Sequence, residues 1–400
     1  AYTPVYDDIP TKITKRIIKD MDKAFFPDKF VMPYIETVHD RIVLEVYRGC
    51  IRGCRFCQAG MVYRPIREKS VDVLNDCAKK LYKATGYDEI SLSSLSISDY
   101  RNIEELCDKL LEWTNDAKVN ISLPSMRLDS FTKELLEKIS TVRNAGLTFA
   151  PEAGTQRLRD AINKNVTEED LLKACRTAFE AGKSQVKLYF MLGLPTETDE
   201  DLEGIAKLAK RVVDTYYDVM RGVRGKKSPK VTISCACFIP KPFTAFQWEA
   251  QSTLEELDRK QKYVLSKIED PKVVFNYHDA DGSRIEAVFA RGDRKLSKAL
   301  LEARRRGIRF DSWDEYFDYN AWCEVFDACG IDPAFYANRE FGENEVLPWD
   351  IIDCGVTKSF LLRERHNAYD SKTNRNCAEQ CTGCGANRLG GERTWCPKQN

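Results

Sequence analysis

Three cysteines, Cys50, Cys54 and Cys57, stand in a C-x-x-x-C-x-x-C run just after an apolar, strand-like segment over residues 41–47. Three thiolates at this spacing on one loop can hold three irons of a four-iron four-sulfur (4Fe-4S) cube, which leaves the fourth iron open to a small molecule. A zinc knuckle is the alternative reading. Zinc normally takes four nitrogen or sulfur ligands, and no fourth cysteine or histidine lies nearby, because His39 precedes the strand.

The residues around these cysteines resemble the radical S-adenosylmethionine (SAM) family. Phe56 precedes the last cysteine, and Arg-Gly pairs stand on either side of Cys50. The resemblance implies that the open iron chelates the amino and carboxylate groups of SAM and that Phe56 lies beside the adenine. It also implies an electron donor such as ferredoxin or flavodoxin, and cleavage of SAM to methionine and a 5'-deoxyadenosyl radical that abstracts a hydrogen from the substrate.

Bulk composition indicates a soluble enzyme. The chain has 400 residues with 62 basic and 62 acidic side chains, so net charge does not attract it to nucleic acid or to a membrane. It contains no apolar run long enough to span a bilayer, and we expect no membrane partner. The 15 cysteines occur without a signal peptide and in metal-like spacings, which favours a reducing cytoplasm over a disulfide framework.

Short apolar runs rich in β-formers alternate with amphipathic stretches along the first 250 residues. The expected strands are residues 41–47, 89–95, 118–123, 147–150, 185–192 and 231–238. The expected helices are residues 71–85, 103–114, 132–140, 168–180 and 199–217. Strand then helix, repeated six times, predicts an α/β fold with a parallel sheet, a partial (β/α)6 TIM-type barrel whose functional residues follow the carboxyl ends of the strands.

Polar side chains at two of these strand ends are candidate SAM contacts. Ser93 and Ser94 end the second strand, where many family members have a glycine-rich segment that binds the SAM amino group; an ordinary polar strand end is the alternative. Ser125 and Arg127 follow the third strand. A guanidinium there can clamp a carboxylate, although a surface ion pair explains it equally well.

The segment LTFAPEAGTQRLRDAINKNVTEEDL resembles the fourth strand and following helix of radical SAM proteins that often carry a cobalamin-binding domain ahead of the barrel. The resemblance implies that Glu152 accepts hydrogen bonds from the amine or ribose of SAM. Lys187, in the fifth strand, points either into the barrel, toward the SAM carboxylate, or into solvent. Gly193 follows that strand in a G-L-P-x-E-T stretch that supports the adenine in the family.

The C-terminal tail contains a second cysteine motif. Cys377, Cys381 and Cys384 repeat the spacing of the first motif, with Cys396 shortly after and Gly383 in place of the aromatic residue. The spacing predicts an auxiliary 4Fe-4S cluster, closed by Cys396 or left open. A structural zinc is the alternative, because four cysteines also satisfy tetrahedral zinc.

We expect four regions. They are a lead-in segment (1–40), the radical SAM partial barrel (41–250), a helical, aromatic-rich extension (251–365) and a cysteine-rich metal-binding tail (366–400). The predicted activity is radical modification of RNA or protein. Cobalamin is expected only if an N-terminal domain is missing from this chain. The alternatives are a cobalamin-linked methyltransferase, a methylthiotransferase, or a non-catalytic iron-sulfur sensing protein.

Overall fold

Two parallel sheets form the centre of the protein in a computed structural model that describes residues 4–124, 127 and 147–390. The first has the order β2-β5-β6, with strands Ile42–Glu45, Glu89–Ser93 and Asn120–Ser122. The second has the order β10-β9-β8-β7, with strands Val273–Tyr277, Lys230–Cys237, Gln185–Leu192 and Leu147–Glu152. Every neighbouring pair is parallel. This confirms the α/β class and the partial-barrel succession of strands.

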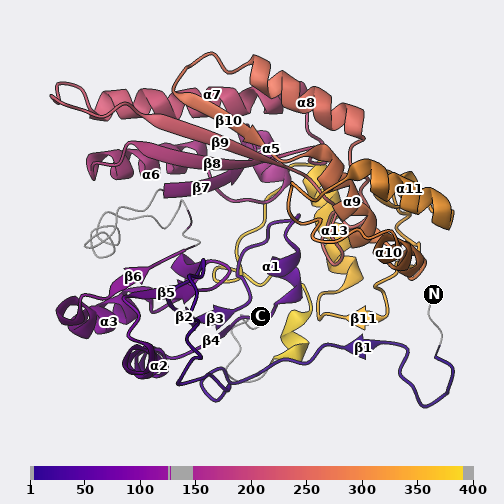
Figure 1. The fold of residues 1–400 in the computed structure, drawn as a ribbon, viewed down its shortest axis with the longest axis horizontal. Helices are drawn as coiled ribbons and strands as arrows, with labels where there is room; N and C mark the ends of the chain where they lie inside the picture. The colour runs from indigo at the N-terminus through magenta and orange to yellow at the C-terminus, as the bar shows by residue number, and fades with distance from the viewer. Residues whose placement is uncertain (1–3, 125–126, 128–146, 391–400) are drawn as a thin grey trace.

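Helices cover the outer side of each sheet (Figure 1). Helices α2 (Val71–Thr85) and α3 (Ile103–Ala117) accompany the first sheet, and α6 (Glu168–Glu180) and α7 (Asp199–Val219) accompany the second. Alternate residues of β8, starting at Val186, are buried with the apolar faces of α6 and α7. Because side chains alternate across a strand, the remaining β8 residues lie on the opposite face of the sheet and are less buried.

Capping residues explain where these helices begin. The Ser70 hydroxyl accepts a hydrogen bond from the Val73 amide at the start of α2. Thr167 and Asp170 form a reciprocal capping box at the start of α6. Such caps satisfy amide groups that have no partner within the helix.

A seventh parallel strand corrects the sequence interpretation, which expected helices and loops beyond residue 250. After α8 (Leu254–Ser266), β10 pairs with β9 and extends the second sheet. The rest of the extension is mainly helical, as expected. Its helices are α9 (Ala280–Arg291), α10 (Leu296–Arg305), α11 (Tyr319–Cys329), α12 (Pro333–Ala337) and α13 (Lys358–Tyr369).

The expected strand at 41–47 is divided in two. Strand β3 (Tyr47–Arg48) leaves the first sheet and pairs antiparallel with β4 (Arg67–Glu68), which encloses the cysteine loop and the short helix α1 (Gln58–Val62). The lead-in segment contributes β1 (Ile13–Thr14), which pairs parallel with β11 (Ile352–Asp353). The N-terminal segment is thereby attached to the chain that leads into the tail.

Some expectations fall on residues outside the described part of the chain. These are the helix at 132–140, Ser125 and Cys396. Within the described residues, no ladder joins β6 to β7, and no helix has the length and apolarity that crossing a membrane requires. The division into four regions stays a prediction.

Candidate iron-sulfur and SAM site

The first cysteine motif forms the loop between β3 and α1. Backbone amides approach its sulfurs: the Arg52 amide donates to Cys50 Sγ at 3.4 Å, and the Gly60 amide donates to Cys57 Sγ at 3.3 Å. Cys57 is also the N-cap of α1. Amide donors and the start of a helix stabilise negative charge on sulfur. The loop therefore offers contacts that stabilise thiolates once a bound metal has ionised the cysteines.

The thiols of this loop lie close enough to influence one another. Burial raises the pKa of Cys50 to about 12, and the neighbouring Cys54 adds to the shift. Burial, followed by Cys54, also raises the pKa of Cys57. Such thiols ionise at neutral pH only when a bound metal supplies positive charge. The donor set fits an iron-sulfur cluster that requires these three thiolates.

The sulfurs do not converge on one point. In the described part of the chain, no group of three or more His, Cys, Asp or Glu side chains could hold a single metal ion. A zinc site brings its sulfurs to about 2.3 Å from one shared ion, whereas the thiolates of a cube bind different irons.

A buried arginine within the motif anchors the loop to distant segments. Arg55 is fully buried and forms an ion pair of 3.2 Å with Glu364 of α13. Its guanidinium also donates to the carbonyl oxygens of Ala161, at 2.8 Å, and Lys372, at 2.6 Å. One side chain therefore joins the cysteine loop to the segment after β7 and to the start of the tail.

Two asparagines extend this polar network. Asn163 donates to the Gly53 carbonyl at 3.0 Å and accepts from the Asn374 amide at 2.9 Å. The Asn374 side chain in turn donates to Glu364 at 2.6 Å. Asn163 has a φ of 51°, a left-handed conformation that asparagine tolerates better than most residues. This backbone shape turns its amide toward the cysteine loop.

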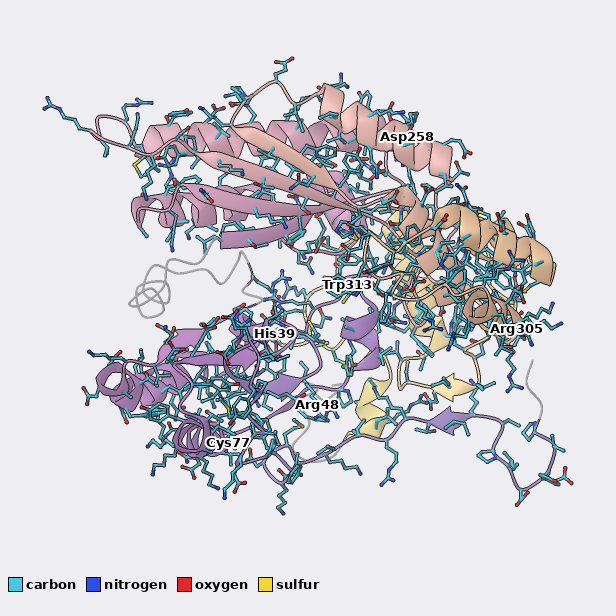
Figure 2. The ribbon with its side chains drawn as sticks, in the orientation of Figure 1. His39, Arg48, Cys77, Asp258, Arg305 and Trp313 are labelled. Carbon is cyan, nitrogen blue, oxygen red and sulfur yellow. The ribbon has the colours of Figure 1, made fainter. Side chains whose placement is uncertain are left out.

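A cavity of about 860 Å³ opens beside the loop at the carboxyl ends of β2 and β5. The residues of interest that line it are Tyr47, Arg48, Gly49, Ser93 and Ser94. Figure 2 labels Arg48 in this lobe, at the strand that leads into the loop. The Ser94 hydroxyl oxygen is buried and has no hydrogen-bond partner among the described residues, although buried hydroxyls normally have one. The site thus offers an unused polar group, which fits a bound polar cosubstrate.

Glu152 lies on the opposite side of the loop. It ends β7 at a register shift and has a φ of 68°. Its carboxylate pairs with Lys164 at 2.9 Å, and both charges act on the Cys57 thiol. The structure therefore brings Glu152 to the cysteine loop, while its contact with SAM stays a prediction.

The remaining predicted contacts differ in their placement. The Arg127 guanidinium donates to the Lys164 carbonyl at 3.2 Å, so Arg127 lies near the Glu152 pair. Lys187 lies on the face of β8 that is opposite α6 and α7, with its ammonium 4.6 Å from the ring centroid of Tyr189, and its contact with SAM stays a prediction. Phe56 packs partly buried against an apolar cluster.

Gly193 begins the turn after β8. Its φ is 84°, and a side chain there would approach the Ser252 hydroxyl oxygen to 3.0 Å. Its amide donates to Glu197 at 2.8 Å, and Glu197 pairs with Lys260 at 2.7 Å in the interior. The turn is therefore a rigid support at the carboxyl end of the strand, and adenine contact stays a prediction.

The tail motif packs directly against the first loop. The Cys377 amide donates to the Ile51 carbonyl at 2.9 Å. Cys384 is buried with Met61 of α1 in one apolar cluster. Figure 1 shows the C-terminal segment running beside α1. The two cysteine motifs are therefore neighbours, which neither spacing alone predicted.

Comparison with known proteins agrees with this geometry. Residues 44–209 match the Radical SAM superfamily. An uncharacterized protein of Methanocaldococcus jannaschii is 34% identical over 306 residues, covering 73% of this chain and 63% of the relative. A putative methylthiotransferase of the same organism is 30% identical over 40% of this chain and 37% of its own length. The chain therefore carries a radical SAM domain.

Two further proteins are similar to parts of this chain. The threonylcarbamoyladenosine tRNA methylthiotransferase of Aquifex aeolicus is 22% identical and covers 69% of this chain and 64% of the relative. Among solved structures, the radical SAM methyltransferase TsrM of Kitasatospora setae has a TM-score of 0.37 and 12% identity, over 48% of this chain and 35% of its own. The chain spans less than two thirds of the length of each of these relatives.

Proposed function

We propose that the protein is a radical SAM enzyme that modifies RNA or protein. A cluster on Cys50, Cys54 and Cys57, when bound, supplies the electron that cleaves SAM to methionine and a 5'-deoxyadenosyl radical. The observation that carries the proposal is the placement of three thiols, with amide donors to two of them, at the carboxyl end of a parallel sheet beside an 860 Å³ cavity.

The chain's own residues provide positioning. Ser93 and Ser94 are proposed to accept and donate hydrogen bonds at the SAM amino acid, and Glu152 to accept from its amine or ribose. Arg127 and Lys187 would face the SAM carboxylate, with Phe56 and Gly193 beside the adenine. Their placement around the loop supports this assignment. A closed, water-poor site strengthens each polar contact and protects a radical from side reactions.

The test is release of 5'-deoxyadenosine by anaerobically reconstituted protein given dithionite and SAM. We expect slow release without substrate, and none from the Cys54→Ala variant. Cys107→Ala is the matched control, because Cys107 is a buried cysteine of α3. If fully iron-loaded wild-type protein releases none with any reductant, the proposal fails in favour of a non-catalytic iron-sulfur protein.

We also propose an auxiliary 4Fe-4S cluster in the tail, on Cys377, Cys381, Cys384 and Cys396. The spacing of the first three and their position against the first loop support it, and zinc is the alternative. After replacement of Cys50, Cys54 and Cys57 by alanine, we expect about four irons per chain to remain. One zinc and almost no iron would refute this cluster.

Methylthiolation is the second candidate, favoured by the similarity to a putative methylthiotransferase over 40% of this chain. An open tail cluster would suit sulfur transfer, and a closed one would suit electron removal. Iron that remains in the triple-alanine variant and binds added sulfide would favour an open cluster and sulfur transfer. We propose ferredoxin or flavodoxin as electron donor and the cytoplasm as the compartment. Cobalamin is proposed only for a longer chain that includes its binding domain.

A further inference from the structure

Arg64, just after α1, is a buried arginine with an unused donor. It is 3% exposed. Its Nε donates to the Gly60 carbonyl at 2.9 Å, and one terminal nitrogen donates to the Arg52 carbonyl at 2.7 Å. The other terminal nitrogen, Nη1, is buried and has no hydrogen-bond partner among the described residues. Buried donors are normally satisfied, and the Cys384 sulfur acts on this guanidinium as an acceptor, although outside normal hydrogen-bond geometry.

The surroundings of Arg64 are the two cysteine motifs. Burial lowers the pKa of Arg64, whereas Cys377, Cys384 and Cys50 raise it above its ordinary value when they are thiolates. Two of these cysteines belong to the tail and one to the first loop. Arg64 is thus within electrostatic range of both motifs.

A second cation lies on the same side. Lys15, from the lead-in segment, donates to the Arg64 carbonyl at 2.6 Å and to the Val62 carbonyl. Burial lowers the pKa of Lys15 to about 8, and Cys354, Asp353 and Cys384 act in the opposite direction. The pairing of β1 with β11 fixes Lys15 here, because the Lys15 amide donates to the Asp353 carbonyl at 3.0 Å. The N-terminal segment therefore places the Lys15 ammonium beside the tail motif.

A carboxylate lies near one of these cations, because Asp353 acts on Lys15 while it also pairs with Arg388. The hydrogen bonds of Arg64 and Lys15 that have normal geometry go to main-chain carbonyl oxygens. A buried charge is costly unless an opposite charge compensates it, and neutral thiols supply none. Cysteines that bind a metal are thiolates, and a cluster that they hold is anionic.

We propose that Arg64 and Lys15 compensate an anionic cysteine-ligated cluster in the tail, and that Arg64 Nη1 donates a hydrogen bond to one of its sulfurs. This inference rests on the auxiliary cluster proposed above. Hydrogen bonds to sulfur and nearby positive charge stabilise the reduced, more negative state of a cluster. Arg64 is therefore a positioning residue that raises the reduction potential of the tail cluster beside the first loop.

The test measures the potential of the tail cluster alone, in protein whose Cys50, Cys54 and Cys57 are replaced by alanine. In this background, the further substitution Arg64→Met should retain the iron. At a fixed potential it should lower the ratio of reduced to oxidised cluster at least tenfold, which is a shift of about 59 mV for a one-electron couple. Arg64→Lys should restore part of this shift. The matched control is Arg291→Met, because Arg291 is 1% exposed and bonds main-chain carbonyls in the helical extension.

Lys15→Met provides a second variant if Arg64→Met does not fold, and we expect it to shift the potential in the same direction. An unchanged potential in every variant that folds would overturn the inference. Zinc in the tail would also overturn it. The wild-type protein, with its first motif intact, would still release 5'-deoxyadenosine in either case, so failure of this inference is distinguishable from failure of the proposed enzyme activity.

Discussion

Glu364→Ala should destabilise the protein by about 3–5 kcal/mol, the cost of removing one partner of a buried ion pair. The side chains of Arg55 and Glu364 are 0% and 2% exposed, so water does not replace the lost carboxylate. Glu364 also accepts from the Asn374 side chain, which loses its partner at the same time. Glu364→Gln retains an acceptor without the charge and should cost less.

Urea titration of the metal-free chain measures this free energy of unfolding. The control is Glu203→Ala, whose ion pair with Lys207 lies on the surface of α7 and whose loss should leave the midpoint nearly unchanged. Replacing both Arg55 and Glu364 by leucine should cost less than Glu364→Ala alone, because no buried charge remains unpaired. A loss below about 1 kcal/mol for Glu364→Ala, the level of a surface pair, would refute the assigned role of this network.

Three further predictions concern SAM binding, pH and packing. Glu152→Ala should weaken SAM binding at least tenfold in calorimetry while the iron content is retained; equal affinity would show that SAM is placed wrongly. Burial raises the pKa of Tyr369 to about 12, so its neutral form stabilises the fold and this contribution is lost as pH rises from about 10 through 12. In Tyr369→Phe, the unfolding midpoint should therefore fall less steeply with pH over this range. The same pH dependence in the variant and the wild type would contradict the prediction. Gly154→Ala places a Cβ 2.2 Å from the Asp201 carbonyl oxygen and should lower the free energy of unfolding by about 1–3 kcal/mol in urea titration. Gly282→Ala, whose nearest neighbour is 4.0 Å away, should cause no such loss. Equal losses in the two variants would exclude the clash.

Local sequence patterns predicted the strands of the barrel well because each strand is a short apolar run bounded by a helix with clear periodicity. Strand β8 begins and ends where expected, at Gln185 and Leu192. Strand β10 was missed because its five residues, VVFNY, are too few to show alternation inside a region rich in helices. Only its pairing with β9 defines it as a strand.

The spacing of the cysteines predicted the candidate metal ligands, but the sequence did not predict the residues that hold the cysteine loop in place. Arg55 and Arg64 lie inside or just after the motif, where an arginine is equally compatible with exposure to solvent. The partner carboxylate of Arg55, on Glu364, is far away in sequence, as Ile51 and Cys377 are from each other. The N-K-N sequence at 163–165 was the one available signal, because asparagine is enriched at left-handed backbone positions, and both Asn163 and Asn165 adopt them.

The bond between Arg55 and Lys372 spans 317 residues, and this separation sets the order of events during synthesis. At about 5–20 residues per second, the cysteine loop leaves the ribosome roughly a quarter of a minute to a minute before the segment that closes over it. During that interval the three thiols lack the contacts that the tail provides. Once the tail folds, Arg55 joins it to the loop, so the loop is more accessible before the tail is synthesised than after.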